Sequence, residues 1–433
     1  MSEPLKVAIA GLGTVGIGTI QVLTIHADQV AARCGRPIQI TAVSARNRRR
    51  KRDADVSSYV WFDDPVVMAK EADADVIVEL IGGSSGVALD LTREALAAGR
   101  HVVTANKALM AEAGAGLAIE AEASGKTLAY EAAVAGGIPI IKALREGLGG
   151  NSFSRVLGIL NGTCNYILST MDATGRDFDD VLKDAQDLGY AEADPSFDID
   201  GVDAAHKLAI LSSLAFGTKV DFESVYVEGI RNVIAKDFEY ARDLGYRVKL
   251  LGLTGELDGG IYQWVHPCLI DAHGPLAAVD GSFNAIIAEG DFVGRSTYEG
   301  RGAGAGPTAS AVVADLMDIA AGRFNHTFAV PSEDLRNAAS VQVEKRVGAY
   351  YVRLKVLDQA GVFADVGSAF RDHRISMESI IQRDHDSDGN VHVVIVTHDV
   401  LESQMMDALE DLEKHEAMVE APHFIRIENL GGE

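Results

Sequence analysis

A glycine-rich turn between a short apolar run and a helix-compatible segment constrains the fold of this chain more than any other feature. Residues 5–10 have the composition of a β-strand, residues 11–16 read GLGTVG, and the helix-compatible segment continues to about Val30. A GxGxxG pattern alone is a weak signal, but a strand before it and a helix after it form the context that dinucleotide binding requires. The turn therefore predicts an α/β domain that binds a dinucleotide.

The spacing of the glycines matches the needs of a bound pyrophosphate. Gly11 permits a tight turn, Gly13 lets the backbone approach the ligand, and Gly16 lets helix and strand pack closely. Thr14 and Val15 stand at the helix N-terminus, where free N–H groups favour an anion. We expect these five residues to bind the cofactor within a Rossmann-type, doubly wound parallel sheet. A glycine turn of some other α/β protein is the alternative.

The second predicted strand, residues 38–43, is followed by cations where an acidic residue often stands. Arg46 and Arg48 come first, and four further cations follow up to Arg52. An acidic residue at this place binds the ribose diol of NAD, whereas a basic group accommodates the 2′-phosphate of NADP. We therefore predict that NADP is used at least as well as NAD, with Arg46 and Arg48 as contacts. A solvated basic loop is the alternative.

Two other stretches are candidates for the cofactor crevice. Strands predicted at residues 75–81 and 101–104 continue the doubly wound sheet, and ligands bind such sheets at the carboxyl ends of the strands. Thr104 and Lys107 lie at such an end, although Lys107 also fits a surface turn. A glycine run containing Gly302 and Gly304 precedes an apolar helix, predicted to begin near Pro307 and end near Ala321, and permits close backbone approach. A flexible linker is the alternative there.

An acidic stretch, residues 186–207, places six carboxylates before Lys207. Gly201 precedes a predicted helix on which Asp203 and Lys207 stand four residues apart on one face. Alone, this stretch reads as a solvated acidic loop, but a cofactor fold upstream favours a substrate site. A desolvated lysine can have a pKa low enough to exchange protons near neutrality. His206 points elsewhere on the helix and is interpreted as a packing residue.

Composition excludes several other classes of protein. The formal charge of −24 argues against a general nucleic-acid surface, and no apolar run approaches the ~18 residues of a membrane span. Cys34, Cys164 and Cys268 lie far apart without a CxxC pair, so buried reduced thiols are expected. The histidines form no HExxH motif, which leaves a catalytic zinc without support. No signal peptide is visible, and a cytoplasmic location is expected.

Several motifs, in this order, resemble those of the monofunctional homoserine dehydrogenases. The resemblance extends to about Arg323. It rests on residues 11–16, 104–107, 131–139, 161–163, 189–195, 203–207 and 302–312. Arg301, where family members often have proline, is the one visible departure and bears on the local shape of the loop.

The resemblance implies NAD(P)-dependent interconversion of L-aspartate 4-semialdehyde and L-homoserine, in threonine and methionine biosynthesis. It assigns proton transfer to Lys207 with Asp203, and a second essential role to Lys107, so which lysine delivers the proton stays open. The implied substrate contacts are Glu192 for the ammonium group, helped by Gly162, Thr163, Tyr190 and Asp198.

The resemblance also implies an ion and an assembly. Glu131, with the carbonyl groups of Val134, Gly136 and Ile138, would hold a monovalent cation such as sodium, which prefers oxygen ligands. The chain would form a homodimer, with a homotetramer built through its C-terminal region as the alternative.

The region beyond Pro331 has a different pattern. Strand, helix, strand, strand, helix and strand are predicted in turn at residues 349–356, 363–373, up to 380, 391–397, 402–414 and near 424, with a turn at 386–390. This order is typical of a ferredoxin-like fold and resembles an ACT domain. The resemblance implies threonine as an effector near Gly361; use of the fold for dimerisation alone is the alternative.

These patterns predict three domains: residues 1–150 completed by 300–330, then 151–299, then 348–433.

Two other functions are alternatives to homoserine dehydrogenase activity. A dehydrogenase for a different amino-acid aldehyde would not need residues 189–195 or the pair Asp203 and Lys207, and a non-catalytic sensor would lose the lysines. A fused aspartate kinase is not expected, because few residues precede the first strand.

Overall fold

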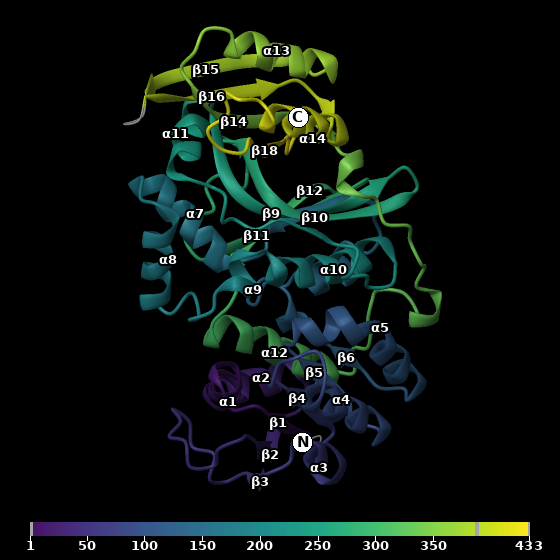
Figure 1. Cartoon of the computed structure of the whole chain (residues 1–433). Helices are drawn as coiled ribbons and strands as arrows, with labels where there is room; N and C mark the ends of the chain where they lie inside the picture. The colour runs from purple at the N-terminus through teal and green to yellow at the C-terminus, as the bar shows by residue number, and fades with distance from the viewer. Residues whose placement is uncertain (1–2, 386–388, 432–433) are drawn as a thin grey trace.

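An all-parallel sheet organises the N-terminal unit of the computed structural model, which describes residues 3–385 and 389–431 (Figure 1). Its strands are β1 (Leu5–Ala10), β2 (Ile38–Ser44), β3 (Val60–Phe62), β4 (Val76–Glu79), β5 (His101–Thr104) and β6 (Leu128–Ala129). Their order is β3-β2-β1-β4-β5-β6. This is the strand order of dinucleotide-binding folds, so the predicted doubly wound sheet is confirmed.

Helices cover both faces of this sheet because side chains alternate along its strands. Leu5, Val7 and Ile9 of β1 pack with α1 (Thr14–Ile25), α2 (Ala27–Cys34) and α12 (Ala305–Ala320). Ala8 and Ala10 face the opposite layer. That layer contains α3 (Pro65–Glu71), α4 (Val87–Ala97) and α5 (Lys107–Ala123).

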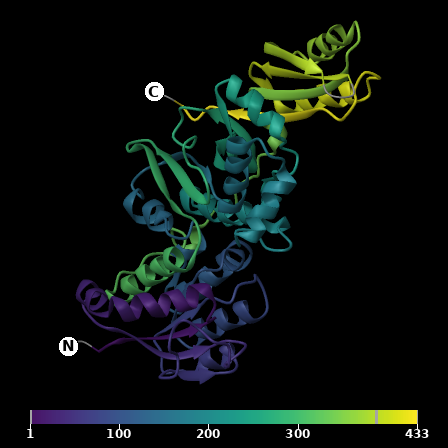
Figure 2. The ribbon, with the colours of Figure 1, turned by 90° about the vertical axis from the view of Figure 1, so that its left-hand side faces the viewer.

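Helix α12 returns from far along the chain to lie beside α1 (Figure 2). The two helices approach closely, since a Cβ at Gly18 would lie 2.6 Å from the carbonyl oxygen of Ala305. Helix α12 begins two residues before the predicted start, with Gly304 as its N-cap. Pro307 is tolerated as the third helical residue because N–H groups of the first turn have no intrahelical partner.

The central unit packs helices against a second, mostly antiparallel sheet. Its strands are β7 (Phe153–Ile159), β8 (Tyr226–Val227), β9 (Tyr246–Leu257), β10 (Gly260–Asp271), β11 (Phe283–Gly290) and β12 (Gly294–Arg301). Its helices are α7 (Gly162–Thr174), α8 (Phe178–Asp187), α9 (Ser196–Ile199), α10 (Val202–Phe216) and α11 (Ala235–Asp243). Helix α10 contacts α5 on one side and β9 and β10 on the other, which places it between the two sheets (Figure 1).

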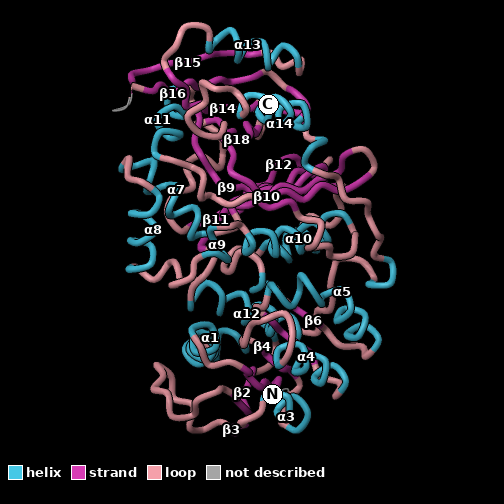
Figure 3. The backbone as a smooth tube through the Cα atoms, in the orientation of Figure 1, coloured by secondary structure: helices cyan, strands magenta, loops and turns pink. Residues whose placement is uncertain are grey.

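The C-terminal module has the predicted βαββαβ order. It consists of β14 (Tyr350–Leu357), α13 (Val362–Asp372), β15 (Met377–His385), β16 (Asn390–Thr397), α14 (Glu402–Glu413) and β18 (His423–Glu428). A two-stranded ribbon of β13 (Val347–Gly348) and β17 (Val400–Leu401) flanks it. The turn predicted at residues 386–390 lies largely outside the described residues. A long loop with two short 3-10 turns, Ser332–Asp334 and Val343–Lys345, joins α12 to this module (Figure 3).

The sheets of the central unit and the C-terminal module are continuous, which the sequence did not predict. Strand β18 runs parallel to β10, with Cys268, Leu269 and Ile270 opposite Arg426, Ile427 and Glu428. The combined order is β12-β11-β7-β9-β10-β18-β14-β16-β15, with β8 also on β10. The module is therefore an extension of the central sheet. In the described part of the chain, no helix is long and apolar enough to cross a membrane.

Candidate active site

The glycine turn after β1 has the backbone geometry that each glycine requires. Gly11 has φ +102°, and a Cβ there would lie 2.4 Å from the carbonyl oxygen of Leu80. A Cβ at Gly16 would lie 2.0 Å from the carbonyl oxygen of Gly11. Gly13 is the N-cap of α1, and a Cβ there would meet no described atom within 4 Å. The space in front of the free N–H groups of Thr14 and Val15 is therefore open, as the binding of an anionic ligand requires.

A buried carboxylate, Glu79, organises the strand ends beside this turn. Its Oε1 accepts the N–H groups of Ile81 and Gly82, and its Oε2 accepts the Thr104 hydroxyl at 2.6 Å. Asn106 in turn donates its backbone N–H to Thr104 and caps α5. The hydroxyl of Thr104 is therefore engaged with protein groups. Glu79 was not predicted as a site residue, although a carboxylate at the end of an otherwise apolar strand was a signal for it.

Several arginines after β2 gather around Trp61. The guanidinium carbons of Arg48 and Arg52 lie 5.6 Å and 5.5 Å from the centre of its ring. Together with Arg50 they line a hollow of about 330 Å³. Arg46 is exposed and is not among the residues that line the hollow. Of the two predicted arginines, the structure therefore brings Arg48 into this cluster and adds Arg50 and Arg52.

Two lysines from different units meet on one carboxylate. The Nζ of Lys107, the first residue of α5, lies 2.8 Å from Oδ1 of Asp203. The Nζ of Lys207 donates to Oδ2 of Asp203 at 2.7 Å and to the carbonyl oxygen of Leu160 at 2.7 Å. Asp203 and Lys207 share a face of α10 as predicted, whereas the contact with Lys107 joins the N-terminal and central units.

The loop at the start of α7 supports this pair of helices. Asn161 caps α7 and donates from Nδ2 to both Asp198 and Asp203 at 2.7 Å. The hydroxyl of Thr163 donates to the carbonyl oxygen of Tyr190 at 2.8 Å. Gly162 packs closely, since a Cβ there would lie 2.7 Å from the carbonyl oxygen of Ser282. The predicted substrate contacts Gly162, Thr163, Tyr190 and Asp198 are thus adjacent to the lysine pair, and Asn161 adds a residue that the predictions lacked.

The charged groups in this cluster shift one another's pKa values. Burial disfavours the carboxylate of Asp203, but Lys207 and Lys107 outweigh it and hold the pKa of Asp203 well below its usual range. Burial also lowers the pKa of Lys107, yet Asp203 acts more strongly and the net pKa is raised. The low pKa that desolvation alone can give a lysine is therefore not found at Lys107. For Asp198, burial and the neighbouring charge of Asp203 raise the pKa.

Two residues of the acidic stretch differ in their surroundings. Glu192 is exposed, and its charge contributes to the raised pKa of Lys107. His206 is buried between the rings of Phe197 and Phe222, with centroids 5.6 Å and 4.2 Å away. Its interpretation as a packing residue is confirmed.

The predicted cation site lies where the glycine run meets the loop after β6. Glu131 is buried, and its two oxygens accept the N–H groups of Ile141 and Lys142 at 2.9 Å. Burial and the nearby Asp315 raise the pKa of Glu131 to about 7. A buried carboxylate of this kind suits a hard cation.

Close backbone contacts shape the same region. Gly136 follows Ala135, and both have positive φ. A Cβ at Gly136 would lie 2.5 Å from the carbonyl oxygen of Gly302, and a Cβ at Gly302 would lie 2.3 Å from the side chain of Asn284. Val134 and Ile138 are buried in the loop. These glycines therefore allow the loop after β6, the glycine run and the segment at Asn284 to pack closely against one another.

Three family models match the chain, each over its own segment. The model described as homoserine dehydrogenase, NAD binding domain, matches residues 11–131. The homoserine dehydrogenase model matches residues 139–317, and the ACT domain model matches residues 350–417. A homoserine dehydrogenase of Pseudomonas aeruginosa is 44% identical to the chain, covering 99% of the chain and 100% of the relative.

This chain belongs to the homoserine dehydrogenase family.

Other relatives and solved structures agree with this membership. Homoserine dehydrogenase of Neisseria gonorrhoeae is 42% identical, with 99% of each chain covered. The crystal structure of a homoserine dehydrogenase from Thiobacillus denitrificans matches with a TM-score of 0.92 and 44% identity, covering 99% of both chains. A hyperthermophilic archaeal homoserine dehydrogenase, solved in complex with NADPH, matches with a TM-score of 0.64 and 26% identity, covering 75% of this chain and 100% of that one.

Membership in the homoserine dehydrogenase family makes the N-terminal unit an NAD-binding Rossmann domain and the C-terminal module an ACT domain. Gly361, the predicted effector residue, is the N-cap of α13 with φ +107° and is exposed. The three cysteines are free and buried, as predicted.

Proposed function

We propose that this member of the homoserine dehydrogenase family interconverts L-aspartate 4-semialdehyde and L-homoserine with NAD(P), in threonine and methionine biosynthesis. The observation that carries the proposal is the carboxylate of Asp203 held between Lys107 and Lys207, 2.8 Å and 2.7 Å away. One lysine comes from the cofactor-binding unit and the other from the central unit. Reduction of an aldehyde needs such a group, because the carbonyl oxygen must receive a proton as its carbon receives a hydride.

The glycine turn fits a dinucleotide, which when bound supplies or accepts the hydride at its nicotinamide ring. The two lysines supply the charge and the proton on the oxygen side. Lys207 has two of its three N–H groups engaged, by Leu160 and Asp203, and is nearly buried. Lys107 has one described acceptor, and 32% of its side chain is exposed. These contacts support Lys107 as the proton donor and Lys207 as the group that holds Asp203 and orients the substrate oxygen.

The substrate's amino-acid end is assigned to the stretch beside the lysines. Glu192 is the carboxylate for the ammonium group, since it is exposed and close enough to affect Lys107. Thr163 and the carbonyl of Tyr190 form a polar edge next to it, and Asp198 supports that edge through Asn161. Gly162 is included as a backbone contact, because a Cβ there would point at the carbonyl oxygen of Ser282.

NADP is proposed as a cofactor used at least as well as NAD. The basic hollow lined by Arg48 supports this choice, because a 2′-phosphate requires cations that the NAD ribose does not. Arg46 follows the same strand end and is retained as a contact. The NADPH complex of the archaeal relative supports the same cofactor class.

A monovalent cation, sodium, is proposed at Glu131 with the carbonyls of Val134, Gly136 and Ile138. The buried carboxylate and the left-handed turn at Ala135 and Gly136 support it. The resident ion would fix the loop that packs against the glycine run at Gly302.

Regulation, assembly and organisation complete the proposal. The ACT domain supports threonine as an effector near Gly361, and a homodimer, or a homotetramer through this domain, as the assembly. The free buried cysteines support a reducing, cytoplasmic location. The domains are residues 1–150 completed by 300–330, 151–299 and 348–433.

One assay tests the proposal directly. Purified enzyme should oxidise NADPH in the presence of L-aspartate 4-semialdehyde, and should reduce NADP in the presence of L-homoserine. Other aldehydes of similar size serve as controls for substrate identity. Absence of both reactions contradicts the proposed function. If the enzyme is active but saturating L-threonine changes neither its rate nor its Tm, only the proposed effector is excluded.

A further inference from the structure

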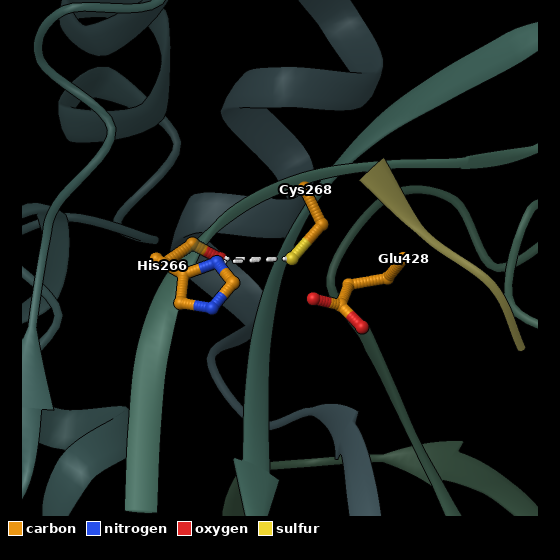
Figure 4. Close-up of side chains that lie close together, drawn as sticks. All are labelled: His266, Cys268 and Glu428. Atoms are coloured by element: carbon orange, nitrogen blue, oxygen red, sulfur yellow. Dashed lines mark hydrogen bonds between the residues drawn. The ribbon is translucent and has the colours of Figure 1, made fainter. Parts of the chain in front are cut away.

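Three side chains with metal-binding atoms lie together at the joint between the central unit and the ACT domain (Figure 4). His266 and Cys268 belong to β10, and Glu428 belongs to β18. Among the described residues, one atom from each comes within 4.8 Å of the others. In Figure 4 the ring edge of His266 that carries the nitrogens faces the thiol of Cys268, and the carboxylate of Glu428 points toward the same space.

This cluster is separate from the active site. Val265 and Leu269 of β10 belong to the apolar core shared with α10, which holds Lys207. Cys268 belongs to a different apolar cluster, with Leu251. Because side chains alternate along a strand, His266 and Cys268 point to the face of the sheet away from the active site.

The imidazole of His266 is not satisfied by the protein. The side chain is fully buried, and its Nε2 has no hydrogen-bond partner among the described residues. Its Nδ1 lies 3.1 Å from the carbonyl oxygen of Pro267 and 3.2 Å from Sγ of Cys268. If Nδ1 carries the proton and donates to Pro267, Nε2 is a buried lone pair; if Nδ1 accepts from the thiol, Nε2–H is a buried donor. Either tautomer leaves Nε2 unpaired, which is unusual for a buried polar group.

A metal ion resolves this problem. Metal-ligating histidines usually donate their other ring N–H to a carbonyl or carboxylate, as Nδ1 can to Pro267. One ligand atom from each of the three residues lies within 4.8 Å of the others, so small movements of the side chains bring them to the ~3.5 Å between ligands of one tetrahedral zinc ion.

The surrounding charges accommodate a divalent ion. Arg346 and Arg426 are the cations next to the cluster, and Glu428, Glu402 and Glu228 are the carboxylates paired with them. Three carboxylates and two guanidinium groups carry a net charge of −1, and a thiolate at Cys268 would bring it to −2. A divalent cation would neutralise this charge.

Glu428 is positioned to ligate without losing its present partner. Arg346 contacts Oε1 of Glu428 at 2.8 Å and 2.7 Å and also donates to the carbonyl oxygen of Ile427, and so orients the carboxylate as the outer partner of a metal ligand does. Glu428 also lines a cavity of about 600 Å³ beside Tyr262 and Trp264. Of the three ligands, only Glu428 lines this cavity, which therefore approaches the cluster from the side of Glu428.

We propose that His266, Cys268 and Glu428 bind one zinc ion, which ties the last strand of the ACT domain to the sheet of the central unit. Nitrogen, thiolate and carboxylate form a ligand set that zinc accepts. The ion replaces the thiol proton, which leaves to solvent, and no redox change is involved. Three protein ligands and water complete a tetrahedral site.

The sequence could not suggest this site. Its ligands are not at the short spacings that mark zinc motifs, because Glu428 arrives only through the pairing of β18 with β10. His266 and Cys268 are two residues apart on one strand, a spacing that gives no metal signal alone.

Cobalt titration of chelator-treated, full-length protein tests the proposal without a variant. Cobalt should bind at one equivalent and give a thiolate-to-cobalt charge-transfer band, which zinc should abolish by displacement. Wild-type protein that binds no cobalt, or binds it without this band, overturns the proposal.

Two variants and a matched control locate the site. Cys268→Ser should remove the band and weaken zinc binding at least ~100-fold, and zinc should no longer raise its Tm. Glu428→Gln, which keeps a hydrogen-bonding oxygen for Arg346, should weaken binding and remain folded. Cys34→Ser removes a buried cysteine of α2 outside the cluster and should behave as the wild type. A charge-transfer band that survives Cys268→Ser, or zinc affinity unchanged in Glu428→Gln, overturns the assignment.

Discussion

Lys107 and Asp203 form an ion pair of 2.8 Å across the boundary between the N-terminal and central units. Lys107 is fixed at the start of α5 by the Asn106 cap, and Asp203 lies in the first turn of α10. A movement of either unit therefore changes the position of a charged group in the proposed active site. The pair couples the arrangement of the two units to the chemistry proposed between them.

Removing either lysine should slow the chemical step. Lys207→Ala and Lys107→Ala are each expected to lower kcat by about 10²–10⁴-fold, the usual contribution of a positioned acid or base. Lys207→Ala should keep its affinity for NADPH, because Lys207 lies on the central unit, and fluorescence titration of the cofactor measures this. Near-wild-type turnover in Lys207→Ala would contradict its role. Asp200→Asn, an exposed neighbour paired with Arg231, serves as the control.

Cofactor selectivity should depend on the basic segment after β2. Arg48→Ala and Arg46→Ala are expected to lower kcat/KM for NADPH by about 10- to 100-fold, since a charge-assisted hydrogen bond contributes about 1.5–3 kcal/mol. The value for NADH should change little. Arg33→Ala, an exposed arginine of α2, is the matched control. An unchanged ratio of the two kcat/KM values in a variant excludes that arginine as a phosphate contact.

Ionisation of Glu131 should make stability depend on pH and on sodium. Its pKa is raised from 4.5 to about 7 in the folded protein, so the folded state binds more protons than the unfolded state between these values. Stability should therefore fall as pH rises from about 4.5 to about 7, by roughly 3 kcal/mol in the absence of a cation.

Sodium should offset this loss because it binds the ionised carboxylate. We expect sodium chloride to raise Tm relative to choline chloride at a pH above 7, and to have little effect at a pH near 5. Glu131→Gln should abolish the difference. An equal response of Tm to both salts at high pH in the wild type would argue against the cation site.

The joint between the central unit and the ACT domain should be sensitive to Arg426. This side chain is 1% exposed and donates to Glu402 and Glu228. Arg426→Ala removes the cation paired with the buried Glu402 and the half-buried Glu228, which keep only tyrosine hydroxyls at 3.3 Å among their described partners, and is expected to destabilise the protein by about 3–5 kcal/mol. Thermal and urea unfolding measure the effect. Arg371→Ala, at an exposed position of α13, should change stability little; equal losses in the two variants would remove the special role of Arg426.

The parts of this site that could be predicted from sequence are local ones. The helix period alone places Asp203 and Lys207 on one face, and the steric limits at Gly11 and Gly16 explain their identity. The contact of Lys107 with Asp203 has no local signal, because it depends on how α5 packs against α10. Glu79 was missed for the same reason: its meaning appears only when the loops after β4 and β5 come together around it.

The C-terminal module shows the same limit. Its six elements follow from hydrophobic patterns, and they occur close to the predicted bounds. The parallel pairing of Cys268 with Arg426 could not be predicted, since the sequence of an edge strand does not state which neighbour it will find. The basic segment after β2 was predictable in part. Its charge could be read from the sequence, whereas the gathering of Arg48 and Arg52 around Trp61 could not.

Sharing of a sheet through β10 and β18 limits how this enzyme can be cut or recombined. A truncation before residue 348 would strip β10 of its neighbour at Cys268, Leu269 and Ile270 and expose unpaired backbone groups. Bare strand edges of this kind promote aggregation. A chimera carrying the ACT domain of another protein would need a final strand that pairs with β10 in the same direction and register. The domain therefore cannot be exchanged freely between proteins.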